Sequence, residues 1–114
     1  MKVSSRLNAA LDVPFYVDTG TSDIMIPLAE ARRLGFCASC PNEQISVMSI
    51  TGMIQLPVMY LDSISLGGAR VTHVKVIVNE HIQVGLLGLG FLKNFVYTVD
   101  AQSRTMEFKR HAAR

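Results

Sequence analysis

The stretch Phe15–Asp23, FYVDTGTSD, places the carboxyl group of Asp18 between an apolar run and a polar turn. A carboxylate beside three apolar residues costs free energy unless it is hydrogen-bonded or has a chemical function. One interpretation is structural, because an Asp that follows a buried strand often caps a turn, which Thr19 and Gly20 would complete. The tripeptide alone favours this structural interpretation, so the surrounding sequence has to decide.

The segments on both sides of this stretch read mainly as strands, bounded by turn residues. The predicted elements are strands at 1–10 and 12–18 around a turn near Leu11-Asp12, a strand at 22–28, a helix at 27–36, a hairpin at 45–66, a turn at 66–68, a strand at 69–79 and a terminal hairpin at 96–110 turned at 101–103. Gly52 marks the tip of the long hairpin. Many short strands with one or two short helices predict an all-β, barrel-like fold.

Length and composition are those of one ordinary globular domain spanning residues 1–114. Apolar residues make up 49% and charged residues 18% of the chain, and the net charge is only +2. The basic residues are scattered, which argues against a nucleic-acid partner. No apolar run approaches the ~20 residues that cross a bilayer, and the N-terminus lacks the apolar core of a signal peptide. We expect a soluble protein of unknown compartment, attached to a membrane only if segments outside this chain anchor it.

The sequence contains two cysteines, Cys37 and Cys40, in a single C-x-x-C pair. A structural zinc site needs four ligands, and neither a second pair nor ligand-spaced histidines accompany this one. A thioredoxin-like pair would begin a helix after a strand, whereas Cys37 follows the end of the predicted helix. We therefore expect reduced cysteines with no metal or redox role, compatible with the cytoplasm, and no cofactor.

Two other chemistries are rejected because the context of their motifs is missing. Residues 18–23 differ little from the aspartyl-phosphate motif of ion-pumping ATPases, but that chemistry needs an acidic metal-binding cluster and a large α/β domain. Gly85, Gly88 and Gly90 have the order G-x-x-G-x-G, the reverse of the dinucleotide-binding fingerprint, and no βαβ unit surrounds them.

Asp18-Thr19-Gly20-Thr21 resembles the D-T/S-G-A/S/T signature of aspartic proteases. In aspartic proteases, which are the known example of this chemistry, two carboxyls share one proton and act as acid and base on one water molecule. Two unit charges about 4 Å apart repel by ~4 kcal/mol at an effective dielectric of roughly 20, so one carboxyl stays protonated. The resemblance implies that Gly20 permits the turn, that Thr19 bonds across to an opposing loop, and that Thr21 or Ser22 donates to the carboxylate.

Further segments, in the right order, are similar to the retropepsin-like aspartic proteases, including their bacterial single-domain members. The strand and helix after Asp18 end near a Leu-Gly pair, and residues 45–59 resemble the flap, a hairpin that closes over bound peptide. Leu86-Leu87-Gly88 resembles the apolar-apolar-Gly segment that crosses behind the catalytic loop. The resemblance covers about residues 3–109 and implies a closed β-barrel with a single lobe. The residues it implies for peptide binding are Thr21, Ser22, Ile50, Thr51, Gly52 and Met53, with Ile24 and Ile82 as further candidates for apolar pockets.

The chain carries only one Asp-Thr-Gly motif. Since one carboxyl cannot be acid and base at once, the resemblance implies a homodimer in which Asp18 of each chain meets at a two-fold axis. Residues 1–5 and 106–114 are the candidate strands of an intersubunit sheet. We therefore expect a homodimeric aspartic endopeptidase that hydrolyses polypeptides. Two alternatives stay open: a catalytically weak retropepsin-like dimerisation or peptide-binding module, and an unrelated β-barrel binding domain with an incidental D-T-G turn.

Overall fold

The structure is a computed structural model that describes residues 2–18, 20–93, 95–100 and 105–110. Within these residues, short strands predominate and two short helices interrupt them. The elements are β1 (Lys2–Leu7), β2 (Leu11–Val17), β3 (Ile24–Pro27), α1 (Leu28–Arg33), β4 (Gln44–Ser49), β5 (Gly52–Leu66), β6 (Ala69–Asn79), β7 (Gly85–Leu87), α2 (Leu89–Leu92), β8 (Phe95–Asp100) and β9 (Thr105–Arg110). The predicted mostly-β fold with one or two short helices is confirmed.

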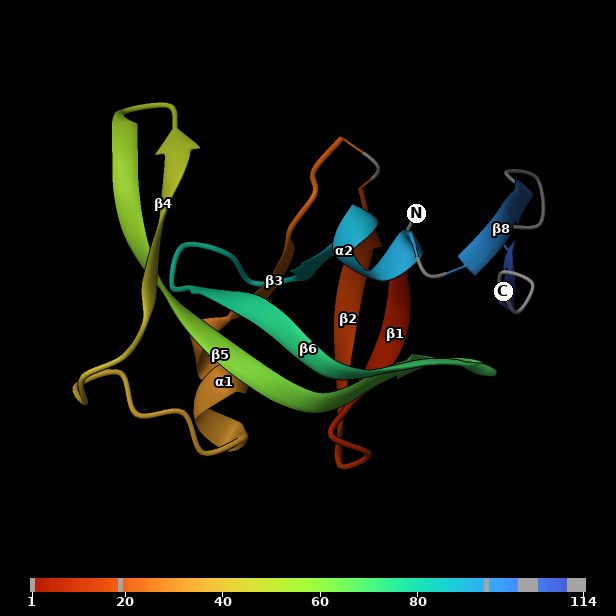
Figure 1. The fold of residues 1–114 in the computed structure, drawn as a ribbon, viewed down its shortest axis with the longest axis horizontal. Coiled ribbons are helices and arrows are strands. Elements are labelled where there is room, and N and C mark those ends of the chain that lie inside the picture. The colour runs from red at the N-terminus through yellow and green to blue at the C-terminus, as the bar shows by residue number, and fades with distance from the viewer. Residues whose placement is uncertain (1, 19, 94, 101–104, 111–114) are drawn as a thin grey trace.

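The strands form a closed barrel with one strand attached outside it. Their order is β1-β2-β7-β3-β6-β5-β4, and β1 pairs with β5 as well as with β2. The β1–β5 pairing closes six strands into a mixed barrel, and β4 hydrogen-bonds to β5 outside that ring (Figure 1). Closure pairs the backbone N–H and C=O groups that an open sheet would leave without hydrogen-bond partners at its edges. The predicted closed barrel is therefore confirmed.

The first hairpin is present, and its turn lies at Asn8–Ala10, slightly before the position predicted near Leu11-Asp12. Asn8 has a left-handed backbone with φ of 52°, which Asn adopts more readily than most residues. Its side-chain oxygen accepts the N–H groups of Asp62 at 2.7 Å and of Ser63 at 3.3 Å, both on β5. The position of the turn thus depends on a contact between distant segments, which the local pattern does not show.

One hydrophobic core fills the barrel, and the inward-facing positions of the strands supply most of it. Burial alternates along β2, where Val13 and Phe15 are fully buried while Asp12, Pro14 and Tyr16 are exposed. Helix α1 adds Ala31, and α2 adds Phe91 and Leu92. Each fully buried large apolar side chain contributes about 1.5–3 kcal/mol relative to exposure. The burial of Phe91 and Leu92 matters for the site, because it fixes α2, the helix that directly follows β7.

Strands β4 and β5 form the predicted long hairpin, which turns at Ile50-Thr51 and pairs from Gln44↔Pro57 to Ser49↔Gly52. Strand β5 then continues into the barrel, pairs with β6 and turns at Gly67, whose φ is 57°. The half of the hairpin that contains the tip projects away from the barrel (Figure 1). Among the described strands, its outer strand β4 is hydrogen-bonded to β5 alone.

Strands β8 and β9 pair in an antiparallel, two-stranded sheet of their own, with Phe95 opposite Arg110. The predicted terminal hairpin is therefore present, while its predicted turn at 101–103 lies outside the described residues. No helix in the described part of the chain is both long and apolar enough to span a bilayer.

Candidate active site

The site is organised by β7, which is inserted between β2 and β3. Strand β7 runs parallel to β2, with Leu87 beside Val17, and antiparallel to β3, with Leu87 beside Ile24. Leu87 is fully buried between the two strands. The loop that joins β2 to β3 spans residues 18–23, and its first residue, Asp18, is hydrogen-bonded to Leu87 at the end of β7. The loop projects from one end of the barrel (Figure 1).

Asp18 is the first residue of this loop and is half-buried. Its own N–H donates to the carbonyl oxygen of Leu87 at 3.1 Å, and the N–H of Gly20 donates to its Oδ1 at 2.9 Å. A Cβ at position 20 would lie 3.2 Å from the same Oδ1, so glycine lets the backbone approach the carboxylate closely. The carboxylate is thus held by the main chain at the end of the barrel. Thr19, predicted to bond across to an opposing loop, lies outside the described residues.

The rest of the loop is fixed by the start of α2. The N–H groups of Leu89 and Gly90 donate to the carbonyl oxygens of Thr21 at 2.9 Å and Ser22 at 2.8 Å. A Cβ on Gly88 would lie 2.4 Å from the carbonyl oxygen of Asp23 and 2.6 Å from that of Thr21. Only glycine allows this contact. Two of the predicted residues behind the loop, Leu87 and Gly88, therefore touch it, while Leu86 is half-buried on β7.

The predicted residues Ile50, Thr51, Gly52 and Met53 lie at the tip of the β4–β5 hairpin. The hydroxyl of Ser49 donates to the carbonyl oxygen of Gly52 at 2.8 Å, and Gly52 has a φ of 120° that favours glycine. Ile50 is fully exposed and Met53 is 59% exposed. The hairpin tip and the Asp18 loop project from the same side of the barrel (Figure 1). Between their described residues the single chain forms no hydrogen bond.

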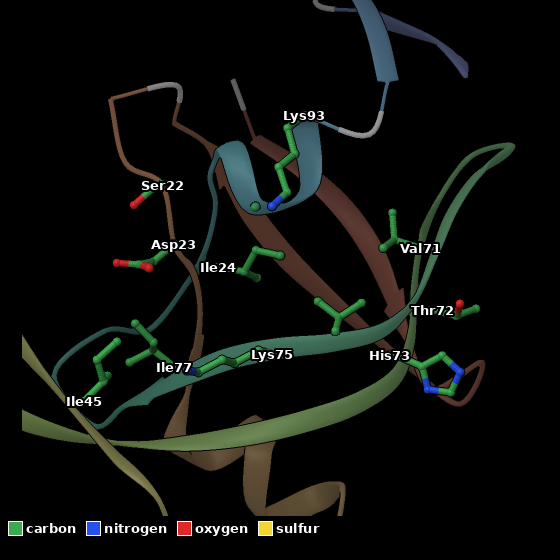
Figure 2. A pocket seen from close by; sticks show the side chains of 12 residues that line it. Ser22, Asp23, Ile24, Ile45, Val71, Thr72, His73, Lys75, Ile77 and Lys93 are labelled. Atoms are coloured by element: carbon green, nitrogen blue, oxygen red, sulfur yellow. The ribbon is translucent and has the colours of Figure 1, made fainter. Parts of the chain in front are cut away.

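A cavity of about 420 Å³ lies beside the loop. Its walls come from Ser22, Asp23 and Ile24, from Ile45 on β4, from residues 71–75 and Ile77 of β6, and from Gly90 and Lys93 (Figure 2). The sequence analysis included Ser22 and Ile24 but missed Asp23, a second carboxylate in the same motif. No hydrogen bond or ion pair joins the Asp23 carboxylate to another residue in the described part of the chain. Ile82 lies elsewhere, in a cavity with α1.

Three polar side chains beside this cavity form a cluster that the sequence analysis also missed. Tyr60 Oη donates to Glu43 Oε1 at 2.7 Å, and Lys75 Nζ lies 3.2 Å from Glu43 Oε2. The hydrogen bond from Tyr60, and next that from Lys75, hold the pKa of Glu43 below its usual value. The same carboxylate raises the pKa values of Tyr60 and Lys75. The pairing of β5 with β6 places Tyr60 opposite Lys75 and so brings the two partners of Glu43 together.

The expectation of two reduced cysteines was wrong, because Cys37 and Cys40 form a disulfide with a Cα–Cα distance of 5.4 Å. The N–H of Cys40 donates to the carbonyl oxygen of Cys37 at 3.3 Å, so the segment folds into a tight turn. This turn brings the two side chains within the range that a disulfide spans. Within the described residues, no three His, Cys, Asp or Glu side chains gather where they could hold a metal ion.

The fold is similar to that of solved retropepsin-like proteases. A retropepsin-like aspartic protease from Rickettsia conorii has a TM-score of 0.75 and 22% identity, with 96% of this chain and 88% of that chain covered. EIAV protease, complexed with the inhibitor HBY-793, has a TM-score of 0.63 and 17% identity, with coverage of 82% and 85%. The protease of Simian Foamy Virus (mac) has a TM-score of 0.58 and 17% identity, with coverage of 82% and 92%.

Comparison with curated proteins gives no match. The profile of the family described as gag-polyprotein putative aspartyl protease matches residues 3–94, which is most of the chain. The family match and the shared fold confirm the resemblance to retropepsin-like proteases. The chain therefore belongs to the gag-polyprotein putative aspartyl protease family.

Proposed function

We propose that the protein is a homodimeric aspartic endopeptidase whose active site contains Asp18 from each of two chains. The observation that carries the proposal is the Asp18 carboxylate, held at the end of the barrel by the Gly20 N–H at 2.9 Å. Within one described chain no hydrogen bond links this carboxylate to a second carboxyl. Asp12, at the opposite end of β2, is paired with Arg6 at 3.1 Å. A two-fold axis would supply the missing carboxyl.

In the proposed reaction, two Asp18 carboxyls share one proton. The ionised carboxyl accepts a proton from water while the water oxygen attacks the peptide carbonyl carbon. The protonated carboxyl gives its proton to the carbonyl oxygen, which forms a tetrahedral diol. The C–N bond then breaks as the nitrogen takes one proton and a diol hydroxyl returns the other to the carboxyls.

The β4–β5 hairpin would act as the flap, closing over a peptide that lies against the Asp18 loop. Met48, Ile50 and Met53 expose apolar side chains at the tip, at 76%, 105% and 59%. A surface of this kind fits contact with peptide or with the partner's hairpin. Thr21 and Ser22 would contact the peptide from the opposite side, and an extended peptide would bond through its main chain.

The 420 Å³ cavity would receive a side chain of the bound peptide, because Ser22 and Asp23 of the Asp18 loop form part of its wall. Ile45 and Ile77 offer apolar surface, and the Asp23 carboxylate offers a hydrogen-bond acceptor (Figure 2). Lys75 and Lys93 line the same cavity, so its charges do not select a basic side chain, and its apolar walls fit an apolar side chain best.

The decisive experiment is peptide-library cleavage from acidic to neutral pH by the unaltered protein, Asp18→Asn and Asp12→Asn. We expect Asp18→Asn to lose on the order of a thousandfold or more in kcat/KM while retaining its melting temperature. Asp12→Asn removes an exposed carboxylate elsewhere and should cleave normally. Equal cleavage by both variants would refute the proposal. Peptide binding without cleavage by any form would instead favour a catalytically weak binding module.

A further inference from the structure

Glu43 connects three segments at the root of the β4–β5 hairpin. Its Oε1 accepts from Tyr60 on β5 at 2.7 Å, and its Oε2 pairs with Lys75 on β6 at 3.2 Å. Its main-chain oxygen accepts the N–H of Val58 on β5 at 2.8 Å. Because Tyr60 and Lys75 lie directly opposite each other, one carboxylate bridges the two strands and the segment that enters β4.

Glu43 lies where a change in this bridge would move the hairpin. Glu43 directly precedes β4, whose outer edge pairs with none of the other strands that the structure describes. Strand β4 is therefore held by β5 along one edge and by the Glu43 contacts at its root. Ile45, two residues later, lines the cavity together with Lys75, across from Asp23 (Figure 2). A shift at Glu43 would thus move both the hairpin and one wall of the cavity.

We propose that Glu43 is a positioning residue that holds the root of the hairpin against β6 and so sets how the hairpin lies over the Asp18 loop. This role rests on the proposed function as a protease. Glu43 touches neither the reacting atoms nor the peptide, and it acts through β4 and through Lys75. Its effect should therefore appear in KM, which reports peptide capture, rather than in kcat.

The charged and titratable groups that face this carboxylate are Tyr60 from β5 and Lys75 from β6, while Asp23 acts on Lys75 from the loop before β3. These partners stabilise the ionised form of Glu43. The contacts are intact at neutral pH and are lost as the pH falls through the lowered pKa of Glu43, below 4.5. The hairpin root should loosen over the same range.

Amide hydrogen exchange of residues 44–57 in the full-length protein tests the anchor without any need for cleavage. In Glu43→Ala we expect exchange in β4 to rise by about two- to fivefold, the size typical of an exposed ion pair, with a smaller rise in Glu43→Gln. Gln keeps an acceptor for Tyr60 but loses the charge facing Lys75. Asp12→Asn breaks a comparable exposed ion pair far from β4 and should leave this exchange unchanged.

Activity provides the second readout. Glu43→Gln should raise KM about two- to fivefold near neutral pH with kcat unchanged, and its KM should lack the acid-side rise expected of the unaltered protein. If hydrogen exchange in Glu43→Ala is unchanged, or if Asp12→Asn changes it equally, Glu43 does not hold the root of the hairpin and the proposal is refuted. If the unaltered protein cleaves nothing, the proposed protease function fails, while the exchange measurement still decides whether Glu43 holds the hairpin.

Discussion

Replacing Gly88 by alanine should destabilise the protein by about 3 kcal/mol. The added Cβ would lie 2.4 Å from the carbonyl oxygen of Asp23, 2.6 Å from that of Thr21 and 2.7 Å from Thr21 Cγ2. Two of these atoms belong to the main chain, and the Thr21 oxygen is fixed by the N–H of Leu89 at 2.9 Å. Overpacking costs about 1–3 kcal/mol, and the upper end applies because the backbone of the Asp18 loop itself must move.

Two other glycines provide matched controls for the same change. At Gly68 a Cβ would meet no atom within 4 Å, so Gly68→Ala should be neutral or stabilise by about 0.5 kcal/mol through the unfolded chain. At Gly90 a Cβ would lie 3.0 Å from the carbonyl oxygen of Ser22, so its effect should fall between the two. The order of destabilisation is therefore Gly88, Gly90, Gly68.

Thermal unfolding followed by circular dichroism measures this order. A loss of about 3 kcal/mol should lower Tm by roughly 12–15 °C, since 1 kcal/mol corresponds to about 4–5 °C at this chain length. Urea unfolding checks the free energy independently. If Gly88→Ala melts within about 3 °C of Gly68→Ala, the close contact between α2 and the Asp18 loop does not exist and the reasoning is refuted.

Four further predictions concern other parts of the molecule. Replacing Cys37 and Cys40 by serine should cost at most about 2 kcal/mol in urea unfolding, because the closed loop is short, and thiol titration of the unreduced native protein should find no free thiol. Glu43→Gln should lower the urea midpoint above pH 4.5, where the depressed pKa keeps Glu43 ionised, and the difference from the unaltered protein should vanish as the pH falls further. Asn8→Ala should cost about 1–2 kcal/mol in urea unfolding because two N–H groups of β5 lose their acceptor, whereas an unchanged midpoint would refute the closure contact. Ile45→Ala should reduce kcat/KM several-fold for peptides with a large apolar side chain in the cavity, with peptides that carry a small side chain there cleaved as before.

Much of the fold could be predicted because its determinants are local. Several elements are each marked by residues that lie close together in the sequence. Examples are the apolar positions along β2, the glycine at position 52 and the turn residues around the 69–79 segment. The Asp18 motif was also visible, since the sharp turn and its carboxylate are adjacent in sequence. The predicted flap role of the hairpin stays a prediction, because it concerns motion over a bound peptide.

What the sequence could not reveal depends on pairing between distant segments. The turn at Asn8 follows from a contact with β5, and the bridge at Glu43 exists only because Tyr60 and Lys75 become neighbours across two strands. The disulfide was missed because the spacing of Cys37 and Cys40 does not show how tightly the chain turns between them.

The sequence by itself determined the elements and the acidic turn, because hydrophobic period and turn chemistry act over a few residues. Only the tertiary structure decided that β7 passes between β2 and β3, and that Gly88 must be glycine because loop oxygens occupy the space of a side chain. The physical reason is that strand pairing is non-local: backbone groups accept any partner, and shape and closure of the whole barrel select one.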